Sequence, residues 1–249
     1  VVFVVSRIPG LGAYRTLFLI DHYALGALAY VVIVTNTVSL LLFAARLVHL
    51  IQAPTPRSVQ MIAAALSLFL VTGLTVYGTV HAANIQTRRY NVRIGPEQEK
   101  MDTLRLVLLS DIHLGYVIEE KHLAKVVTAV NALKPDIICI AGDIFDGDIT
   151  SLSNPEKLQA LFRKMESGYG VFACLGNHDA GDGYRQMLDF LDGAGIRVLM
   201  DEAVVIDQRF VLAGRRDSFP IGAHGDSRKN LEGLPDDKSL PVIVLDHQP

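Results

Sequence analysis

Two long apolar segments without a charged residue divide this chain into two parts of different character. They run from Ala24 to Ala45 and from Met61 to Val80. A helix needs about 20 apolar residues to cross the ~30 Å hydrocarbon core of a bilayer. Two such segments in close succession favour membrane-spanning helices over buried helices of a soluble core. We therefore predict a membrane region over residues 1–83, with at least two transmembrane helices at about 24–45 and 61–83.

The rest of the chain has the composition of an ordinary soluble protein. Residues 84–103 are polar and contain Gly95-Pro96, which predicts a linker, and one soluble domain is expected over residues 104–249. The sequence starts without methionine and stops directly after an apolar run. We therefore interpret it as a fragment whose soluble domain is incomplete at the C-terminus. The arginine counts around the spans slightly favour a cytoplasmic location of the soluble domain. The margin is small, so the side of the membrane on which this domain lies stays open.

Charge and cysteine content argue against two other classes of protein. The formal net charge is −3, which lacks the basic surplus of a nucleic-acid-binding protein, so no nucleic-acid partner is expected. The two cysteines, Cys139 and Cys174, both lie in apolar, strand-like runs. We expect them to be buried, reduced thiols, because a disulfide framework needs more cysteines in a shorter chain.

Apolar strands alternate with helical patterns in the soluble part, which predicts an α/β fold. Near-continuous apolar runs indicate parallel strands covered on both faces. After Gly195 the short strand candidates follow one another without helices, which predicts a second, more antiparallel sheet. The first three strands are expected at 104–110, 136–141 and 171–175, the helices at 119–133, 155–165 and 184–191, and the last strand at 240–245.

Polar residues follow each of these strands at the point where the strand ends. Because parallel strands end at one edge of a sheet, these side chains should converge although about 30 residues separate each group from the next. Carboxylates, imidazoles and an amide suit Mn, Fe, Zn or Mg, and they outnumber the ligands of one ion. Two ions bridged by a carboxylate predict hydrolysis of phosphate esters. The converging residues are Asp111, His113, Asp143, Asp146, Asn177, His178, Asp179 and His247.

Four motifs carry a resemblance to a known family. "SDIHLG" (110–115), "GDIFDG" (142–147), "GNHD" (176–179) and "LDHQP" (245–249) resemble the successive motifs of the calcineurin-like metallophosphoesterase superfamily. The resemblance covers roughly 104–249 and, with the spans, looks like the membrane-attached bacterial branch. It implies a four-layer α-β-β-α metallophosphoesterase sandwich preceded by transmembrane helices. The family's final G-H-x-H motif, which supplies two further metal ligands, does not occur before Pro249.

The resemblance also implies a dinuclear site with two divalent metal ions, of which Mn, Fe and Zn are the expected choices. Asp111 and His113 would bind the first ion, and Asp143 would bridge both. Asn177, through its side-chain oxygen, and His247 would bind the second ion. A hydroxide held between the ions would attack phosphorus in line with the leaving oxygen.

Two catalytic residues follow from the same resemblance. His178 would protonate the leaving alkoxide or stabilise the phosphoryl charge. Asp146 would hold the His178 imidazole and favour its protonated form. Asp179 would support the ligands from behind.

The substrate is expected to be a phosphate ester, either a phosphodiester or a lipid-linked phosphate. In phosphoprotein phosphatases Arg-Gly follows the second motif and the third motif ends in Glu. Gly147 and Asp179 occupy these positions in this chain, which argues against a protein phosphatase. Arg215, Arg216 and Arg228 lie in a loop that could meet anionic groups, although a solvated charged loop is the favoured interpretation.

Two other functions remain open from the sequence. One is a non-catalytic, metal-binding membrane scaffold or sensor, against which the intact motifs speak. The other is a transporter with an appended domain, against which the lack of ionisable residues inside the spans speaks. In each case the chain is expected to be a multi-pass protein, in a bacterial cell membrane.

Overall fold

The computed structural model describes residues 15–93, 103–222, 228–229 and 240–249. The chain divides into two compact units, Val1–Gln86 and Thr87–Pro249. The division falls inside the predicted linker, and each unit is described by itself below.

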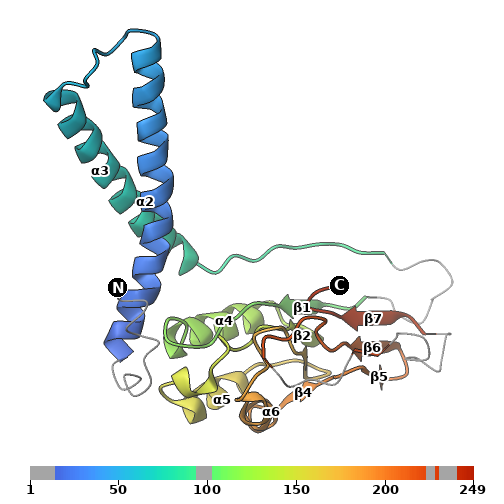
Figure 1. Ribbon diagram of the computed structural model, residues 1–249. Coiled ribbons are helices and arrows are strands. Elements are labelled where there is room, and N and C mark those ends of the chain that lie inside the picture. The colour runs from blue at the N-terminus through green and yellow to red at the C-terminus, as the bar shows by residue number, and fades with distance from the viewer. Residues whose placement is uncertain (1–14, 94–102, 223–227, 230–239) are drawn as a thin grey trace. The chain divides into compact units, whose positions relative to one another are not determined.

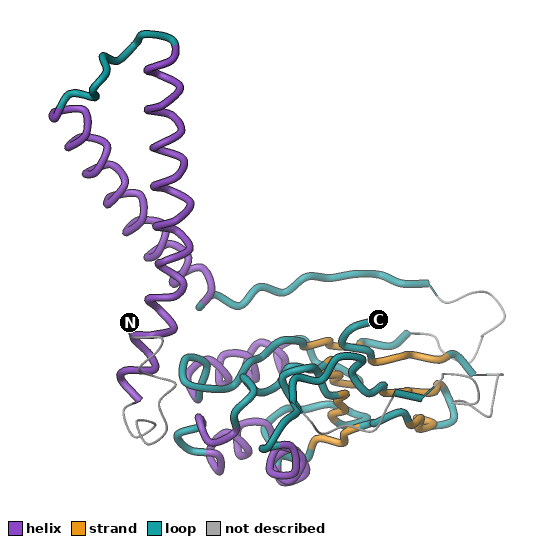
Figure 2. Tube along the Cα trace, viewed as in Figure 1, coloured by secondary structure: helices purple, strands orange, loops and turns teal. Residues whose placement is uncertain are grey.

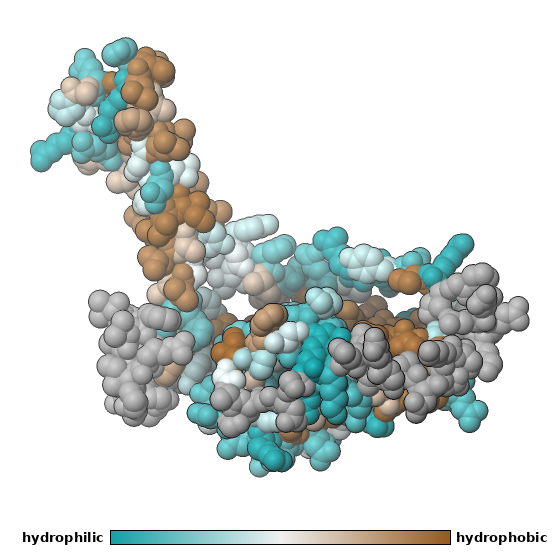
Figure 3. Space-filling view, turned by 45° about the vertical axis from the view of Figure 1, so that its right-hand side comes forward, coloured by the Kyte–Doolittle hydropathy of each residue, from teal (hydrophilic) through white to brown (hydrophobic). Residues whose placement is uncertain are grey.

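The first unit consists of two long helices, α2 (Arg15–Leu47) and α3 (Arg57–Ala82). Both are long and apolar enough to cross a membrane, with mean hydropathies of 2.1 and 2.0 over their most apolar windows. Their apolar side chains are largely exposed; Leu40 is 66% and Phe69 is 74% accessible. Brown, hydrophobic surface accordingly predominates along these helices (Figure 3). A helix that is apolar all round and unburied needs a non-aqueous environment, which indicates membrane association.

The helix α2 begins nine residues before the predicted span at Ala24. This first part contains Asp21 and His22, which is why the charge-free segment did not include it. The N-terminal part of α2 is therefore more polar than its remainder.

The second unit contains a parallel four-stranded sheet in the order β1-β2-β3-β4 (Figure 1). Helices α4, α5 and α6 connect its strands, as the alternating pattern predicted. Buried leucine and valine side chains of α4, at Leu123, Val126, Val127 and Val130, form one helical face. The elements are β1 (Leu106–Leu109), α4 (Glu120–Ala132), β2 (Ile137–Ala141), η2 (Ile149–Ser151), α5 (Pro155–Phe162), β3 (Val171–Cys174), α6 (Tyr184–Gly193) and β4 (Ile196–Val198).

The strand β4 corrects one expectation. The segment after Gly195 was expected to join the second sheet, but β4 pairs in parallel with β3 in the first sheet, with Ile196 beside Val171. The reason is that α6 precedes β4 and serves as a crossover helix, so β4 follows the third strand–helix unit as the fourth parallel strand.

A second sheet of three strands has the order β5-β6-β7. Its strands are β5 (Glu202–Ile206), β6 (Phe210–Gly214) and β7 (Val242–Leu245). The pair β5–β6 is antiparallel, as expected, whereas β6 and β7 are parallel. The second sheet is therefore mixed.

One hydrophobic core cluster lies between the two sheets. One face of β2 and β3 packs against residues of the second sheet, in a cluster that includes Cys139, Phe172, Cys174, Phe210 and Leu245. The other face of the first sheet is covered by α4–α6, so helices, first sheet and second sheet form three successive layers (Figures 1 and 2). Within the described residues no helix covers the outer face of the second sheet, where the fourth layer was expected. The mixed α/β class is confirmed.

Both cysteines are buried free thiols, as predicted. Burial raises the pKa of each thiol to about 12, so neither is a thiolate at neutral pH.

Candidate metal centre

The loops that follow β1 and β2 run side by side and carry the first three predicted ligands. The backbone amide of Asp111 donates to the carbonyl of Gly142 at 3.1 Å, and that of His113 donates to the carbonyl of Asp143 at 3.0 Å. These bonds extend the parallel pairing of β1 and β2 beyond the strands. The ligand-bearing loops are thereby fixed in register with each other.

Three of the predicted ligands adopt left-handed backbone conformations. The φ angles are 54° at Asp111, 50° at His113 and 50° at Asp143. Such angles are uncommon outside glycine, cost energy, and gather at functional sites. Their concentration here is therefore an independent reason to consider this sheet edge a functional site.

Asp143 lies at the centre of the site and is 4% exposed. One carboxylate oxygen, Oδ2, is 3.5 Å from Nε2 of His113 and 3.4 Å from Nε2 of His247. The other oxygen, Oδ1, accepts a hydrogen bond from the backbone amide of His178 at 2.9 Å. One buried carboxylate thus lies between two imidazoles, whose residues are near the beginning and the end of the domain's sequence.

Asn177 and His247 meet on the other side of Asp143. The ring nitrogen Nε2 of His247 is 3.1 Å from Oδ1 of Asn177, and Nδ1 is 2.8 Å from the carbonyl oxygen of Ala141. A bond from Nδ1–H to that carbonyl leaves the lone pair of Nε2 pointing at the site. Oδ1 of Asp111 lies 3.9 Å from Nε2 of His113. The structure therefore brings together all five predicted ligands, Asp111, His113, Asp143, Asn177 and His247.

The predicted catalytic pair lies beside these ligands. Polar atoms of His113, Asp146 and His178 all lie within 4.8 Å of one another. The rings of His113 and His178 meet edge to face, with centroids 5.0 Å apart. Oδ1 of Asp146 lies 3.4 Å from Nδ1 of His113. The expected contact of Asp146 with His178 stays a prediction.

Asp179 joins the loops after β2 and β3 from beneath. Its carboxylate accepts three backbone hydrogen bonds, from Ile144 at 3.1 Å, Phe145 at 2.9 Å and Gly176 at 2.9 Å. Burial raises the pKa of Asp179 to about 6, although the three backbone hydrogen bonds lower it. Its carboxyl group thus connects the two loops through these three hydrogen bonds.

Two glycines allow the loops to approach one another this closely. A Cβ atom at Gly142 would lie 2.7 Å from Cα of Gly176 and 2.7 Å from the ring of His247. A Cβ atom at Gly176 would collide with the backbone and carboxylate of Asp143. The glycines of the two motifs are required by this packing.

The residues fit a divalent metal. Carboxylate, imidazole and amide oxygen donors of this kind suit Mn, Fe and Zn. Contact with Asp146, and further the charges of Asp143 and Asp111, raise the pKa of His113 despite an opposing effect of burial. The pKa of His247 is raised as well. Burial lowers it, but the hydrogen bond to the Ala141 carbonyl and the nearby negative charges outweigh that effect. These charges belong to Asp143, Asp111 and Asp217. The site thus has a negative electrostatic potential that attracts cations, and bound cations would displace protons.

The sequence did not reveal how two residues, Gln248 and Arg228, contact the site. Gln248 donates from Nε2 to Oδ1 of Asn177 at 2.7 Å. Arg228 forms an ion pair with Asp246 and donates to the carbonyl of Gln248 at 3.1 Å, so it contacts both neighbours of His247. No local motif marks Arg228, because 18 residues separate it from Asp246. Gln248 adjoins His247 in the last motif, and that adjacency was the available signal.

The basic loop differs from the favoured interpretation as a solvated segment. The side chains of Arg215 and Arg216 are only 12% and 20% exposed and lie at 4.0 and 3.8 Å from the buried carboxylate of Asp201. They therefore serve, at least in part, to fix the loop that follows β6.

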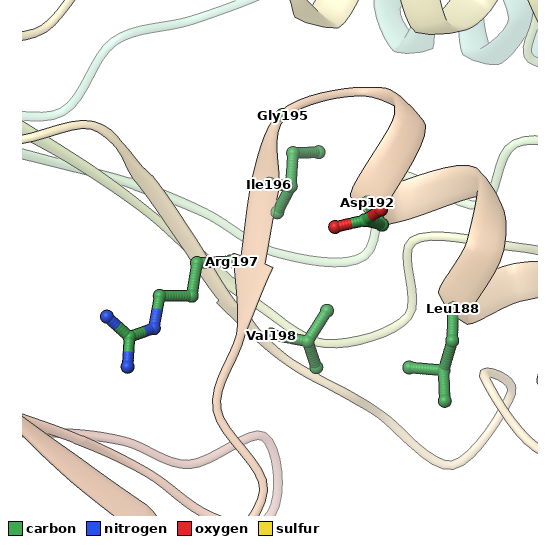
Figure 4. Close-up of a pocket in the computed structure, with 6 residues that line it drawn as sticks. All are labelled: Leu188, Asp192, Gly195, Ile196, Arg197 and Val198. Carbon is green, nitrogen blue, oxygen red and sulfur yellow. The ribbon is translucent and has the colours of Figure 1, made fainter.

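A hollow elsewhere in this unit lacks such chemistry. It lies between α6 and the edge strand β4 and is lined by Leu188, Asp192, Gly195, Ile196, Arg197 and Val198 (Figure 4). Arg197 extends from the strand on the side away from Leu188. None of the predicted site residues lines it, so it is separate from the metal centre.

Comparison with known proteins agrees with this geometry. The sequence pattern of the calcineurin-like phosphoesterase family matches residues 104–249. An uncharacterized metallophosphoesterase of Aquifex aeolicus is 34% identical over 189 residues, which are 73% of this chain and 69% of that protein. The chain belongs to the calcineurin-like phosphoesterase family, a class of metal-dependent phosphoric ester hydrolases. The superfamily expected from the motifs is thereby confirmed.

Other relatives bear on the membrane and on the substrate. A transmembrane protein with metallophosphoesterase domain from Danio rerio is 32% identical over 74% of this chain, which spans 44% of that relative. The UDP-2,3-diacylglucosamine pyrophosphatase LpxG of Chlamydia trachomatis is 32% identical over 95 residues, 38% of this chain and 28% of that protein. Together with α2 and α3, the name of the Danio rerio relative indicates membrane association.

Proposed function

We propose that this chain is the membrane-anchored part of a dinuclear metal phosphoesterase. The observation that carries the proposal is Asp143, a buried carboxylate whose Oδ2 lies within 3.5 Å of two imidazoles. With Asp111 and His113 on one side, and Asn177 and His247 on the other, its position suits a bridge between two ions. Mn, Fe and Zn are the ions that this set of donors favours.

Bound ions would polarise the phosphoryl group and lower the pKa of water at the site. His178 is the proposed proton donor to the leaving oxygen, because its ring lies beside the ligand His113 and its backbone is anchored on Asp143. Asp146 lies within reach of both imidazoles, and we assign it to orienting them. Asp179 and Gln248 hold the ligand-bearing loops in place.

The proposed substrate is a phosphodiester or a lipid-linked phosphate. Two apolar helices tie the chain to a membrane, where such esters occur. The LpxG relative is named for a diacylated, UDP-linked glucosamine, which is a lipid-linked phosphate compound. We further propose that the protein is multi-pass and lies in a bacterial cell membrane.

The test is hydrolysis by the full-length protein in detergent with added Mn²⁺. Bis(p-nitrophenyl) phosphate serves as the phosphodiester and p-nitrophenyl phosphate as the phosphomonoester. We expect turnover that a chelator abolishes and that falls at least about 1,000-fold in Asp143→Asn, since a bridging charge is lost. Asp189→Asn is the matched control, because Asp189 is an exposed carboxylate on α6.

Stoichiometric metal binding without turnover of either ester would contradict catalysis of generic esters and favour a non-catalytic scaffold or sensor. Equal turnover in wild type and Asp143→Asn would show that the bridging role is wrong.

A further inference from the structure

A short loop beside the metal centre exposes two large apolar side chains. Phe219 is 73% and Ile221 is 55% accessible, and Pro220 separates them. In the second unit most large apolar side chains are buried between the layers. Exposed apolar surface that adjoins a functional site is a candidate ligand-binding surface.

The loop is held against the ligand Asn177. The backbone amide of Ile221 donates to the carbonyl oxygen of Asn177 at 2.9 Å. Next to it, a Cβ atom on Gly222 would lie 2.9 Å from Cα of Gly181, so the two backbones touch. The apolar pair is therefore attached directly to the loop that carries Asn177 and His178.

Two further bonds fix the shape of the loop. The carboxylate of Asp217 accepts from the backbone amide of Phe219 at 2.7 Å, which forms a tight turn. Arg228 donates to the hydroxyl of Ser218 and to the carbonyl of Gln248, the residue after His247. Because the turn is braced from both the Asn177 and the His247 sides, Phe219 and Ile221 are presented on a preorganised platform.

The chemistry of a ligand that fits this arrangement has two parts. A phosphoryl group belongs at the metal centre, where cations would neutralise it. The organic group attached to that phosphate would then extend past Asn177 and reach Ile221 and Phe219. Contact with these side chains removes apolar surface from water only if the organic group is itself apolar.

We propose that Phe219 and Ile221 form a binding site for the hydrocarbon chain of an amphiphilic phosphate ester. This inference rests on the proposed phosphoesterase function and adds to it the residues that select an alkyl or acyl substituent. The loop discriminates between esters of the same phosphate by the length of their apolar part.

The experiment compares two phosphodiesters that differ only in the alkyl group, methyl p-nitrophenyl phosphate and octyl p-nitrophenyl phosphate. The full-length protein is assayed in nanodiscs with Mn²⁺, and the ratio of kcat/KM for octyl over methyl is measured. We expect this ratio to fall about tenfold or more in the double variant Phe219→Ser/Ile221→Ser. Val205→Ser is the matched control, because Val205 is an apolar residue on β5 that is 55% exposed and lies outside the site loops.

Binding separates this inference from the proposed function. Calorimetry with octyl phosphate and methyl phosphate requires no turnover. If neither ester is hydrolysed but octyl phosphate binds more weakly to the double variant, the phosphoesterase proposal is wrong and the apolar site stands. If both esters are hydrolysed with an unchanged ratio, the apolar site is wrong and the phosphoesterase stands. An equal loss for both esters would also overturn the apolar site, since the loop would then only support the metal centre.

A fluorescence measurement distinguishes the substrate chain from the bilayer itself. The chain has no tryptophan, so the difference in fluorescence between Phe219→Trp and the unsubstituted protein reports the indole at position 219. A blue shift that requires octyl phosphate supports the proposal. A full blue shift in nanodiscs before any ligand is added would assign the loop to the bilayer surface and overturn it.

Discussion

Asp179 holds two loops of the metal centre together through one carboxylate. It accepts backbone hydrogen bonds from Ile144, Phe145 and Gly176 and is 1% exposed. A buried amide that loses its acceptor costs about 1–3 kcal/mol. Loss of this side chain would therefore affect three donors at once and release the ligands that the loops carry.

We expect Asp179→Ala to lower the free energy of unfolding by about 3 kcal/mol or more, because three buried amides lose their acceptor. The measurement is denaturant unfolding of the full-length protein. Asp189→Ala removes an exposed carboxylate from α6 and should change the stability by less than about 0.5 kcal/mol. Similar effects of both variants would show that Asp179 does not join the loops.

Arg228 contacts the residues on both sides of His247. It forms an ion pair with Asp246, whose side chain is 12% exposed, and donates to the carbonyl of Gln248. The side chain of Arg228 is itself only 18% exposed. Because it contacts both neighbours of His247, we assign Arg228 to positioning that residue.

We expect Arg228→Met to weaken binding of Mn²⁺ about tenfold, since outer partners of metal ligands have effects of this size. Competition with a chelator measures the affinity without relying on turnover. Arg197→Met is the control, because Arg197 is exposed on β4. Unchanged affinity in Arg228→Met would mean that β7 alone positions His247.

At the scale of elements, the strand ends meet because glycines let their loops touch. Gly142 has a φ of +75°, and an added Cβ would press on Gly176 and His247. Gly195 has nearly the same φ, +74°, but nothing lies within 4 Å of its added Cβ. Comparing alanine substitutions at Gly142 and Gly195 therefore separates the free-energy cost of the backbone conformation from the cost of crowding.

We expect Gly195→Ala to lower the free energy of unfolding by about 1 kcal/mol, the cost of a left-handed alanine. Gly142→Ala should lower it by more than about 3 kcal/mol, because crowding adds to that cost, and should also weaken metal binding. Thermal unfolding and metal titration of both variants provide the comparison. Equal destabilisation would show that the loops can separate freely.

At the scale of the whole molecule, the surfaces of the two units suit different environments, an apolar one for the helices and water for the second unit. The helices α2 and α3 expose apolar side chains along their length, whereas the second unit buries its apolar residues between sheets and helices. A divalent ion bound at the strand ends should therefore stabilise the second unit and leave the helical unit unaffected.

We expect Mn²⁺ to slow amide hydrogen exchange in the loops 111–115, 142–147 and 176–181, because binding adds stability by mass action, about 2.7 kcal/mol at a hundredfold excess over Kd. Exchange in α2 and α3 should not change. Mass spectrometry of the full-length protein with Mn²⁺ and with a chelator makes the comparison. Slowed exchange across both units would show that the ion acts beyond its own domain.

Much of this organisation is written locally in the sequence. Apolar runs long enough to span a bilayer, and the alternation of strands and helices, depend on neighbouring residues along the chain. The same is true of the polar groups that end each strand, so Asp111, Asp143 and Asn177 could be selected as site residues and are indeed brought together.

Other features depended on contacts between distant segments. The position of β4 in the first sheet follows from the crossover through α6, and its short sequence has no preference between the sheets. Arg228 and Gln248 act on the site through bonds that connect separate loops. Periodicity and motifs report what each segment prefers, whereas the pairing of strands and the close approach of loops are decided by packing across the whole domain. For this reason the sequence determined the kind of protein and predicted its principal site residues, and only the tertiary structure showed how those residues are held and which apolar loop lies beside them.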